Sequence, residues 1–567
     1  MPQKSADATR TGAERLVETL EVLGVEVVFG LPGVHNLPIW RALAGTSIRL
    51  VTVRHEQAAA YAADGYTRVT GRLGVCLVTT GPGAANVLGG TGEAMASGSP
   101  ILVIATDIPS HLRRAGVYRG VLHETRDQRA MFVPVVKDAR TVASADDIAA
   151  EVLRAALVAR DLPTGPAYLG IPTDLLSQPA PSSVSTQTNC SEPPLPSDSE
   201  LSAASTLLRS AKNPLIWAGG GAARASAGPA VAELAERLVA PVITTYMGRG
   251  LLPADHPCHV PGSPLLREVG CLWDEADLVV AIGTDFDGTM TQNWLMPSPP
   301  HLLAVNIDAR DAAKNYVPDL TLVGDAHAVT RLLAQRTPTR GGLERLRTRL
   351  QAVGEEIRHT VSRDDEHALA FLDAMKDLLP SDAVLMLDMC IPGYWLVSFH
   401  PVAGPRQMHY PVGWGTLGFG FPAALGAAIG AKGRVVCVTG DGGFLYACGE
   451  LATAAQEQLP ITVVLVDDGG YGMLRFDQIH AGEEPFGVDW RSPDFVGLAR
   501  SFGVDADIVE GFGDAFSEKL KHSLNARGPC VLVVRANLRP PPTTYPRWYR
   551  RVDPPPSREY ERVDVAG

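Results

Sequence analysis

The sequence predicts an α/β protein made of three doubly wound domains with parallel sheets. Short apolar segments alternate with helix-period segments along most of the 567 residues. This alternation is typical of parallel sheets covered by helices on both faces. Two breaks rich in turn-forming residues, 177–198 and 336–342, divide the chain into three blocks of this kind. A length of 567 residues also favours several domains over one.

The first block, 1–180, begins with an amphipathic segment, Ala13 to Leu23, which predicts a helix. Four apolar runs follow, Val25 to Phe29, Leu50 to Val53, Leu73 to Val78 and Ile101 to Ala105, and the last two are candidates for buried strands. Between the second and third of these runs lies a stretch of small residues that predicts a second helix, Ala58 to Arg68.

The middle block, 195–335, and the third block, 345–540, repeat this pattern. The strands expected in the middle block are Pro214 to Ala218, before Gly219-Gly220-Gly221, and Leu278 to Ile282, before Gly283. Those expected in the third block are Ala383 to Leu387, Arg434 to Thr439 and Ile461 to Val466, with a crossing helix from about Phe444 to Gln458 between the last two. The remaining tail, 541–567, is rich in proline and aromatic residues, and both a cover over an active-site mouth and a passive surface strap stay open for it.

Composition narrows the class of protein. A net charge of −12 without a compensating basic block argues against a nucleic-acid partner. The eight cysteines are scattered and form no CxxC pair, which indicates reduced packing residues and no zinc site. The polar N-terminus does not resemble a signal peptide, and no run is long enough to span a bilayer. We therefore expect a soluble, cytoplasmic protein without a membrane partner.

Two aspartates follow neighbouring strands of the third block. Asp441 lies in Gly440-Asp441-Gly442, and Asp468 lies in Asp467-Asp468-Gly469-Gly470. Both would lie at the carboxyl ends of parallel strands, where α/β sheets bind ligands. Carboxylates suit a hard cation such as Mg²⁺ that also binds substrate phosphates. The alternative is a pair of ordinary turns, because Asp and Gly are common at strand ends.

Two further glycine-rich turns, 79–86 and 413–422, predict a backbone that closely approaches a ligand. Glycine inside an element costs about 0.5–1 kcal/mol, so its repeated use indicates a functional requirement. Glu56 begins the helix that follows Arg54-His55. On this segment alone, a capping or dipole-matching role is the simpler interpretation of that glutamate.

Taken together, Glu56, Gly415-Thr416-Leu417-Gly418, Gly440-Asp441-Gly442 and Asp468 make the chain resemble a family over nearly its whole length. It resembles the thiamine diphosphate-dependent enzymes of the acetolactate synthase and 2-oxo acid decarboxylase group. The resemblance implies a pyrimidine-binding domain at 1–180, a Rossmann-like domain at 195–335 and a diphosphate- and Mg²⁺-binding domain at 345–540. It also implies a homodimer or homotetramer whose active site takes Glu56 from one subunit and the diphosphate site from another.

The resemblance also assigns roles to residues. Glu56 would be catalytic, bonding N1′ of the cofactor pyrimidine, and His123 would be a second catalytic residue. The metal ligands would be Asp441, Asp468 and the carbonyl of Gly470. Leu417 would support the bent cofactor, and the Gly415 carbonyl would orient its 4′-amino group. The full set of cofactor-binding residues implied is Glu56, Gly83, Gly415, Leu417, Gly440, Asp441, Gly442, Gly443, Asp468, Tyr471, Gly472 and Met473.

Several positions depart from the acetolactate synthase pattern. Asp468 replaces the usual asparagine ligand, and Thr173 stands where these synthases typically carry a lysine. His123 lies in the segment 122–131, where they usually show Phe-Gln-Glu. That segment and 29–35, which contains His35, resemble decarboxylases that act on 5-guanidino-2-oxopentanoate. The carboxylates Glu124 and Asp127 could suit a cationic substrate or could simply be solvated.

The resemblance therefore implies non-oxidative decarboxylation of a small-molecule 2-oxo acid through an enamine intermediate. The first alternative is a carboligase of the acetolactate synthase type, which joins that intermediate to a second carbonyl compound. The second alternative is a non-catalytic protein that retains the fold. Relatives bind FAD or ADP at the positions that correspond to 219–221, 244–248 and 306–308. Glycine turns alone are weak signals for a nucleotide, so bound FAD stays an open alternative.

Overall fold

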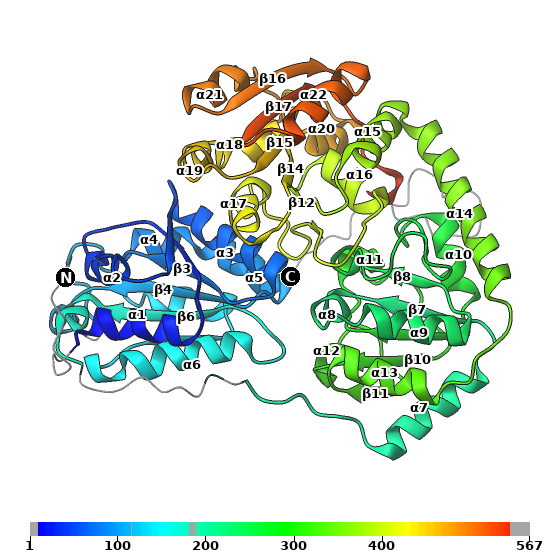
Figure 1. Cartoon of the computed structure of the whole chain (residues 1–567), viewed down its shortest axis with the longest axis horizontal. Coiled ribbons are helices and arrows are strands. Elements are labelled where there is room, and N and C mark those ends of the chain that lie inside the picture. Colours follow the sequence, from blue (N-terminus) through cyan, green and yellow to red (C-terminus); the bar gives the residue numbers. More distant parts are fainter. Residues whose placement is uncertain (1–9, 115, 181–187, 189, 545–567) are drawn as a thin grey trace. The chain divides into compact units, whose positions relative to one another are not determined.

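The computed structural model describes residues 10–114, 116–180, 188 and 190–544. It contains three β-sheets whose strands all pair in parallel, each flanked by helices (Figure 1). This architecture confirms the predicted class of three parallel-sheet α/β domains. Most of the tail, 545–567, lies outside the described residues.

The first sheet has the strand order β2-β1-β3-β4-β6-β5. Its strands are β1 (Val27–Gly30), β2 (Arg49–Thr52), β3 (Gly74–Val78), β4 (Ile101–Asp107), β5 (Asp138–Thr141) and β6 (Ala167–Pro172). Its α-helices are α1 (Gly12–Val22), α2 (Leu37–Leu43), α3 (Glu56–Thr70), α4 (Pro82–Asn86), α5 (Leu88–Ser97) and α6 (Ile148–Arg160). Side chains of the central strands alternate between two apolar cores, as expected for a sheet buried on both faces.

Local signals in the sequence explain where several helices begin. Thr11 and Glu14 form a capping box at the start of α1, and Ser197 and Glu200 form another at the start of α7 (Asp198–Ser210). In each box the hydroxyl accepts an N–H of the first turn while the glutamate accepts the backbone N–H of the capping residue. A helix end is also marked in the sequence: at the C-terminal end of α3, Gly71 adopts a left-handed conformation, which ends the helix.

The second sheet has the order β11-β10-β9-β7-β8. Its strands are β7 (Pro214–Ala218), β8 (Val242–Thr244), β9 (Leu278–Ile282), β10 (Leu302–Asn306) and β11 (Leu320–Val323). The α-helices after α7 are α8 (Gly220–Arg224), α9 (Gly228–Leu238), α10 (Arg267–Glu275), α11 (Gly288–Thr291), α12 (Ala309–Ala313), α13 (Ala326–Arg336), α14 (Leu343–Asp364) and α15 (Glu366–Leu378). The predicted break at 336–342 separates α13 from α14.

The third sheet has the order β13-β12-β14-β15-β17-β16. Its strands are β12 (Val384–Leu387), β13 (Met408–His409), β14 (Val435–Gly440), β15 (Ile461–Asp467), β16 (Asp505–Glu510) and β17 (Cys530–Arg535). The remaining α-helices are α16 (Ile391–Phe399), α17 (Gly420–Gly430), α18 (Asp441–Leu445), α19 (Leu451–Gln456), α20 (Gly472–His480), α21 (Phe495–Ser501) and α22 (Asp514–Leu524).

The helix expected at about 444–458 is interrupted. The structure instead places α18, the 3₁₀ turn η7 (Cys448–Glu450) and α19 in succession between β14 and β15. The break falls at Ala447, whose φ of −139° and ψ of 15° do not continue a helix, and Gly449 follows two residues later. The connection still joins two parallel neighbouring strands, as predicted.

The described residues divide into two compact units. The first and third sheets lie in one unit (the described residues of 10–193, with 377–393 and 406–537), and the second sheet lies in the other (194–376, 394–405 and 538–544). Within the first unit, α3 and α17 pack at very short range. A Cβ at Gly426 would lie 1.8 Å from the carbonyl oxygen of Ala62, and one at Gly65 would lie 2.1 Å from that of Ala423.

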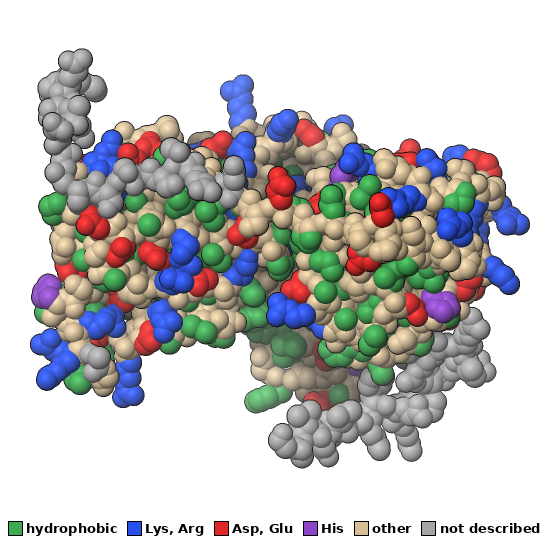
Figure 2. Space-filling view, turned by 90° about the horizontal axis from the view of Figure 1, so that it is seen from below, with side chains coloured by type: hydrophobic (Ala, Val, Ile, Leu, Met, Phe, Trp, Pro, Cys, Tyr) green, Lys and Arg blue, Asp and Glu red, His purple; other side chains and the backbone are tan. Residues whose placement is uncertain are grey.

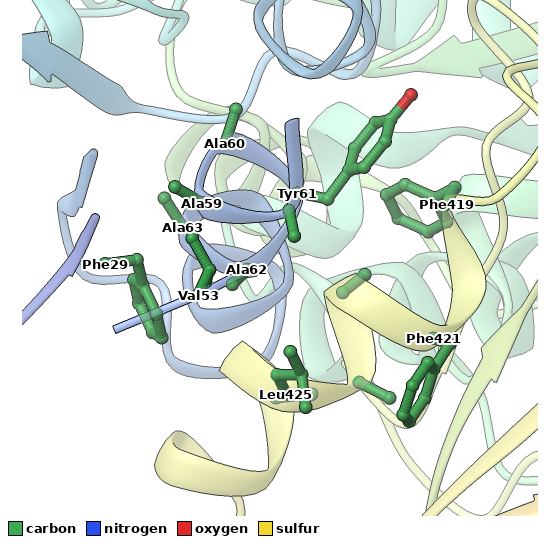
Figure 3. Close-up of a cluster of buried hydrophobic side chains, with 14 of the residues drawn as sticks. Phe29, Val53, Ala59, Ala60, Tyr61, Ala62, Ala63, Phe419, Phe421 and Leu425 are labelled. Atoms are coloured by element: carbon green, nitrogen blue, oxygen red, sulfur yellow. The ribbon is translucent and has the colours of Figure 1, made fainter. Parts of the chain in front are cut away.

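Figure 3 shows this contact, with Ala62 of α3 on the side toward α17, which carries Phe421 and Leu425, and with Ala59 and Ala63 on the side toward Phe29. Small side chains let the two backbones approach, so residues of the first and third sheets share one apolar core. This core holds the helix that begins at Glu56 against the helix that follows the 413–418 loop.

On the face shown in Figure 2, acidic and basic side chains lie scattered among one another. Within the described part of the chain, none of the helices is long and apolar enough to cross a bilayer.

Candidate active site

In open parallel sheets, ligands bind at the carboxyl ends of the strands, beside the point where connections leave two neighbouring strands in opposite directions. This point lies between β1 and β3 in the first sheet and between β12 and β14 in the third. The turns 30–33 and 79–83 adjoin the first point, and Asp388 and Gly440-Asp441-Gly442 adjoin the second. The glycine turns found in the sequence therefore lie where such sheets bind ligands.

Asp441 joins the ends of two neighbouring strands of the third sheet. It is the first residue of α18 and only 1% exposed. Its Oδ1 accepts the N–H of Gly442 (2.9 Å), and its Oδ2 accepts the N–H of Gly470 (3.1 Å), which lies beyond the end of β15. Burial and the nearby Asp468 carboxylate raise the pKa of Asp441 to about 7.

Asp468 directly follows β15, and its Oδ1 is buried without a hydrogen-bond partner among the described residues. Burial raises the pKa of this carboxyl group to about 6, against the opposing charge of Arg475. Asp441 is buried and Asp468 is half-buried, and two such neighbouring carboxylates that are only partly bonded are unfavourable unless a cation or protons compensate them.

The donor set therefore fits a hard cation with oxygen ligands. Among the residues that the structure describes, no group of three Asp, Glu, His or Cys side chains could hold a metal ion. A cation here would take the rest of its ligands from backbone carbonyls, such as that of Gly470, and from a bound molecule.

The other residues predicted to bind the cofactor diphosphate surround these aspartates. Gly440 ends β14, Gly442 and Gly443 lie in the first turn of α18, and Tyr471 precedes Gly472 and Met473 at the start of α20. A Cβ at Gly472 would lie 2.1 Å from Oδ2 of Asp468, so a larger residue there would displace that carboxylate. The ring of Tyr471 packs against Trp490 at 4.7 Å between centroids.

Asp388, a residue not predicted from the sequence, ties the 413–418 loop to this site. Its Oδ1 accepts the N–H groups of Met389 (2.8 Å) and Gly418 (3.1 Å), and its Oδ2 accepts the Thr439 hydroxyl (3.1 Å). Burial raises the pKa of this carboxyl group. The sequence does contain a signal for this residue: Asp388 directly follows a predicted strand. In the structure, that strand lies at the point where the strand order reverses.

The 413–418 loop has the backbone that its glycines predicted. Gly415 and Gly418 have φ angles of +64° and +76°, in the left-handed region that favours glycine. The N–H of Trp414 donates to Oε2 of Glu93 (3.1 Å), which fastens the loop to α5. Leu417 is half-buried, and Oγ1 of Thr416 is buried without a partner in the described structure.

Glu56 begins α3 and is 9% exposed. Its Oε2 accepts a hydrogen bond from Nδ2 of Asn86 (2.9 Å). A Cβ at Gly83 would lie 3.3 Å from its Oε1, so the 81–83 turn passes directly beside the carboxylate. The capping of α3 is performed by His55, whose Nδ1 accepts the N–H of Gln57. The carboxylate of Glu56 is thus free for a role other than capping its own helix.

His123 and His35 meet at the other side of the same turn. A Cβ at Gly81 would lie 2.5 Å from the carbonyl oxygen of His123. The two imidazole rings are 5.3 Å apart between centroids, in an edge-on arrangement. His123 has a left-handed φ of +66°, which is uncommon outside glycine, and its Nδ1 is buried without a partner in the described structure.

A chain of hydrogen bonds orients His35. Its Nδ1 lies 2.8 Å from Oγ1 of Thr80, and the Thr80 hydroxyl donates to Oγ1 of Thr106 (3.0 Å). Because the hydroxyl proton of Thr80 is used in this way, Nδ1 of His35 carries the proton and Nε2 holds a free lone pair. Burial and the neighbouring His123 lower the pKa of His35, which favours the neutral ring.

Gln128, a second residue not predicted from the sequence, holds the loop that carries His123. It is buried, accepts the N–H of Gly81 (2.7 Å) and donates to the carbonyl of Thr106 (2.8 Å) and the hydroxyl of Tyr168 (2.8 Å). A buried amide with all these bonds satisfied fixes the loop in one position. No sequence pattern marks it, because its partners lie on three separate elements.

The loop carboxylates have local roles. Glu124 accepts the N–H groups of Arg119 and Val121 (both 2.9 Å), and the side chain of Asp127 accepts the N–H of Ala130 (3.1 Å). Thr173, in the position where acetolactate synthases typically carry a lysine, donates its hydroxyl to the carbonyl of His35 (2.7 Å).

The structure thus assembles two groups of the predicted residues. Around the 81–83 turn it brings together Glu56, Gly83 and His123. Around the ends of β14 and β15 it brings together Asp441, Asp468, Gly470 and their glycine neighbours, and Asp388 connects the 413–418 loop to this second group. In the middle domain, the glycines 219–221 pack backbone to backbone against Gly283. That packing is a structural reason for those glycines.

Comparison with family models gives three matches in chain order. They are the thiamine pyrophosphate enzyme N-terminal TPP binding domain at residues 10–131, the central domain at 201–333 and the C-terminal TPP binding domain at 390–534. Each of the three sheets has most of its strands within one of these ranges.

Curated relatives agree with these matches. The chain is 37% identical over 530 residues to the Probable 2-ketoarginine decarboxylase AruI of Pseudomonas aeruginosa, which covers 91% of this chain and 93% of that protein. It is 31% identical over 558 residues to the Probable acetolactate synthase large subunit of Methanocaldococcus jannaschii, covering 92% and 91% of the two chains.

A solved structure agrees with the fold. The X-ray structure of a protein from Mycobacterium smegmatis, described as a thiamin diphosphate-dependent enzyme, superposes with a TM-score of 0.78 at 27% identity. The match covers 94% of this chain and all of the other. The chain therefore belongs to the thiamine pyrophosphate enzymes and is an enzyme of the 2-oxo acid decarboxylase and acetolactate synthase type.

Proposed function

We propose that the protein catalyses the Mg²⁺-dependent, non-oxidative decarboxylation of a 2-oxo acid to an aldehyde and CO₂, with thiamine diphosphate as cofactor. The observation that carries this reaction type is the pair of imidazoles, His35 and His123, beside the turn that adjoins Glu56. The 37% identity to a protein named a 2-ketoarginine decarboxylase supports the same conclusion.

The residues at the third sheet fit the cofactor diphosphate and its cation. Asp441, Asp468 and the carbonyl of Gly470 would hold Mg²⁺, and the unpartnered Oδ1 of Asp468 supports this assignment. Gly440, Gly442, Gly443, Tyr471, Gly472 and Met473 would surround the diphosphate, while Gly415 and Leu417 would contact the rest of the cofactor. When bound, the thiazolium accepts the electron pair that CO₂ leaves behind.

Glu56 would hold or release a proton at its carboxylate oxygens, next to the cofactor pyrimidine. Its near-complete burial and its bond to Asn86 keep the carboxylate in one orientation. A buried carboxylate that shares a proton with a ring nitrogen is a suitable acid–base partner.

The histidine pair supports an aldehyde as product. Decarboxylation is completed when a proton reaches the carbon atom that has lost CO₂, whereas a carboligase reserves that carbon for a second carbonyl compound. A neutral imidazole with a free Nε2 can accept and donate a proton near pH 7. His35 has this form through Thr80, and His123, its ring neighbour, would be the residue that contacts the substrate.

The carboligase alternative rests on the similarity to acetolactate synthases. Thr173 favours the decarboxylase, because its hydroxyl is bonded to the backbone of His35 and supplies no positive charge.

We also propose a homodimer as the smallest active unit, with a tetramer as a further possibility. Large apolar side chains of the third domain are at least 40% exposed in the 413–418 loop, in and just after α18 and on α20: Trp414, Leu445, Tyr446, Leu474 and Ile479. A group of such side chains is typical of an interface between subunits. The proposed domain limits are 1–180, 195–335 and 345–540, followed by the tail 541–567, and the ranges of the three family models support them.

A panel of 2-oxo acids tests the reaction. The purified protein is incubated with thiamine diphosphate, Mg²⁺ and each acid in turn, including pyruvate and 5-guanidino-2-oxopentanoate, and the products are identified by mass spectrometry. We expect an aldehyde and CO₂, and loss of both when Mg²⁺ is removed by a chelator. An acetohydroxy acid as the main product would replace the proposal with the carboligase. CO₂ release that survives complete removal of divalent cations would refute the Mg²⁺ site.

The role of the histidine pair is tested by His123→Gln in the same assay. We expect aldehyde formation to fall by about 10²-fold, within the range for removal of a general acid–base group. Any acetohydroxy acid formed by the wild-type enzyme should become a larger share of the products. His111→Gln is the control, because that histidine is 68% exposed at the surface. An unchanged rate and product ratio in the His123 variant would contradict the proposal.

A further inference from the structure

Glu450 is a buried carboxylate of the third domain that bonds to the backbone of the first domain. It ends the 3₁₀ turn η7, nine residues after Asp441, and is 1% exposed. Its Oε1 accepts the N–H groups of Arg54 (2.8 Å) and His55 (3.0 Å). Its Oε2 accepts the hydroxyl of Thr453 (2.6 Å), which fixes the carboxylate plane.

The two N–H groups that Glu450 binds immediately precede Glu56. These N–H groups have no partner in the sheet, because β2 is an edge strand that ends at Thr52. The last hydrogen bond of this segment to β1 is the one that the N–H of Val53 donates to the carbonyl of Gly30. They also lie before the first turn of α3, so the helix offers them no acceptor. Glu450, whose own carboxylate is buried, supplies the acceptor for both N–H groups.

Weaker contacts surround the hydrogen bonds that Glu450 accepts from residues 54 and 55. Arg54 donates to Oε1 of Gln456 (2.8 Å), and Arg49 pairs with Glu457 (2.7 Å) at the exposed rim. These surface contacts contribute little by themselves. The buried carboxylate is therefore the group that determines where the chain turns from β2 into α3.

We propose that Glu450 is a positioning residue for Glu56: it holds the backbone from which the catalytic carboxylate projects. The inference rests on the proposed function, because it assumes the role given there to Glu56. Glu450 lies in the segment that starts at Asp441, so the same stretch of chain reaches both the proposed metal site and the base of Glu56. In a dimer whose subunits share their active sites, the Glu56 and the Asp441 of one chain belong to two different sites. This stretch of chain would then connect the two sites.

The test measures a property of Glu56 that does not depend on the substrate: the exchange of the C2 proton of bound thiamine diphosphate with deuterium, followed by quenched-flow NMR. In Glu450→Ala we expect the exchange to slow by at least about tenfold, because a misplacement of about 1 Å in a catalytic group can cost about 10²-fold. Cofactor affinity, measured by calorimetry, should change much less.

Two variants separate positioning from general stability. In Glu450→Gln the side-chain oxygen can still accept both N–H groups, so exchange should stay within about threefold of the wild type. Glu457→Ala is the matched control, since it removes a carboxylate from the same interface without touching residues 54 and 55. If Glu450→Ala is insoluble, Glu450→Asp replaces it, because the shorter side chain keeps the charge but does not reach both N–H groups.

The outcomes are distinct. Wild-type exchange in Glu450→Ala or Glu450→Asp would overturn the proposal, and so would an equal loss in Glu457→Ala. If Glu56→Gln itself leaves C2 exchange unchanged, the role of Glu56 fails, independently of any result at Glu450. If C2 exchange behaves as expected but no 2-oxo acid is turned over, the positioning role stands while the proposed reaction fails.

Discussion

At the scale of single residues, the candidate site consists of carboxylates and imidazoles that are held by hydrogen bonds and wholly or partly buried. Asp441 is buried and the neighbouring Asp468 is half-buried, and desolvation raises the pKa of both. Glu56 is nearly buried and is bonded to Asn86. Asp441 and Glu56 are held by backbone N–H or amide donors from a neighbouring element, so their positions depend on the fold as much as on their own residue type.

Glu56→Gln should lower turnover by about 10²–10⁴-fold, because an amide cannot exchange a proton with the cofactor ring. The fold and the oligomer should be retained, since an amide oxygen still accepts the bond from Asn86. Steady-state kinetics measure the first effect, and circular dichroism with size-exclusion chromatography measures the second. Glu457→Gln is the same change at the surface and should leave turnover unaltered. Full activity in Glu56→Gln would refute the assignment.

A buried histidine away from the site predicts how stability depends on pH. Burial, together with the charge of Arg68, lowers the pKa of His409 from 6.5 to about 3. Below pH 6.5 the unfolded chain therefore binds a proton that the folded chain does not. The free energy of unfolding should fall as the pH decreases, by up to about 1.4 kcal/mol per pH unit from this one group.

His409→Gln tests this dependence. The amide can still donate to the carbonyl of Arg406, the bond that Nε2 of His409 makes at 3.0 Å. The melting temperature of the variant, measured between about pH 6.5 and pH 4.5, should decrease less steeply than that of the wild type. Parallel curves for the two proteins would show that His409 is protonated in the folded state.

At the scale of elements, the contact between α3 and α17 is decisive. The two helices touch through glycine and alanine, and this brings the start of α3, with Glu56, and the 413–418 loop before α17 onto one rigid body. The interruption of the helix predicted at 444–458 belongs to the same arrangement. It turns the chain at η7, so that Glu450 can reach the backbone before α3.

Gly426→Ala should disrupt this contact. The added Cβ would lie 1.8 Å from the carbonyl oxygen of Ala62, and a backbone atom cannot move aside as a flexible side chain can. We expect the free energy of unfolding to fall by at least about 3 kcal/mol, the upper end of the usual cost of overpacking. Chemical denaturation measures this difference.

Gly341→Ala is the matched control. A Cβ added at that glycine would meet no atom within 4 Å, and its φ is not positive. Its substitution should therefore change stability by less than about 0.5 kcal/mol. A wild-type denaturation midpoint in Gly426→Ala would show that α3 and α17 are not packed as described.

At the scale of the whole molecule, the proposed active site takes Glu56 from one subunit and Asp441 from the other. Variants with one of these residues changed would each be inactive as homodimers. In a mixed dimer of Glu56→Gln and Asp441→Asn chains, however, one of the two sites would contain both native residues.

Co-expression of the two variants tests this arrangement. Random pairing should restore about a quarter of the wild-type activity, because about half of the dimers are mixed and each has one intact site. Affinity purification through a different tag on each chain then isolates the mixed dimers, whose activity should be about half that of the wild type. If a site were complete within one chain, mixing would restore no activity.

The sequence by itself determined the three parallel sheets and the glycine and aspartate turns at their strand ends. It could do so because each of these depends on local pattern: apolar runs of strand length, helix-period segments between them, and residues that permit a turn. The same local signals located Glu56, Asp441 and Asp468. These residues could be compared with those of the family because the motifs of the family are short and contiguous in sequence.

Only the tertiary structure decided which groups these residues meet. Gln128 and Glu450 act through bonds to elements that are distant in the chain, and no local pattern marks a buried polar side chain whose partners lie on other elements. The orientation of His35 likewise depends on Thr80 and Thr106, which only the parallel pairing of β3 and β4 places side by side. Burial and hydrogen-bond satisfaction are properties of the packed chain, so they become visible only after the sheets have assembled.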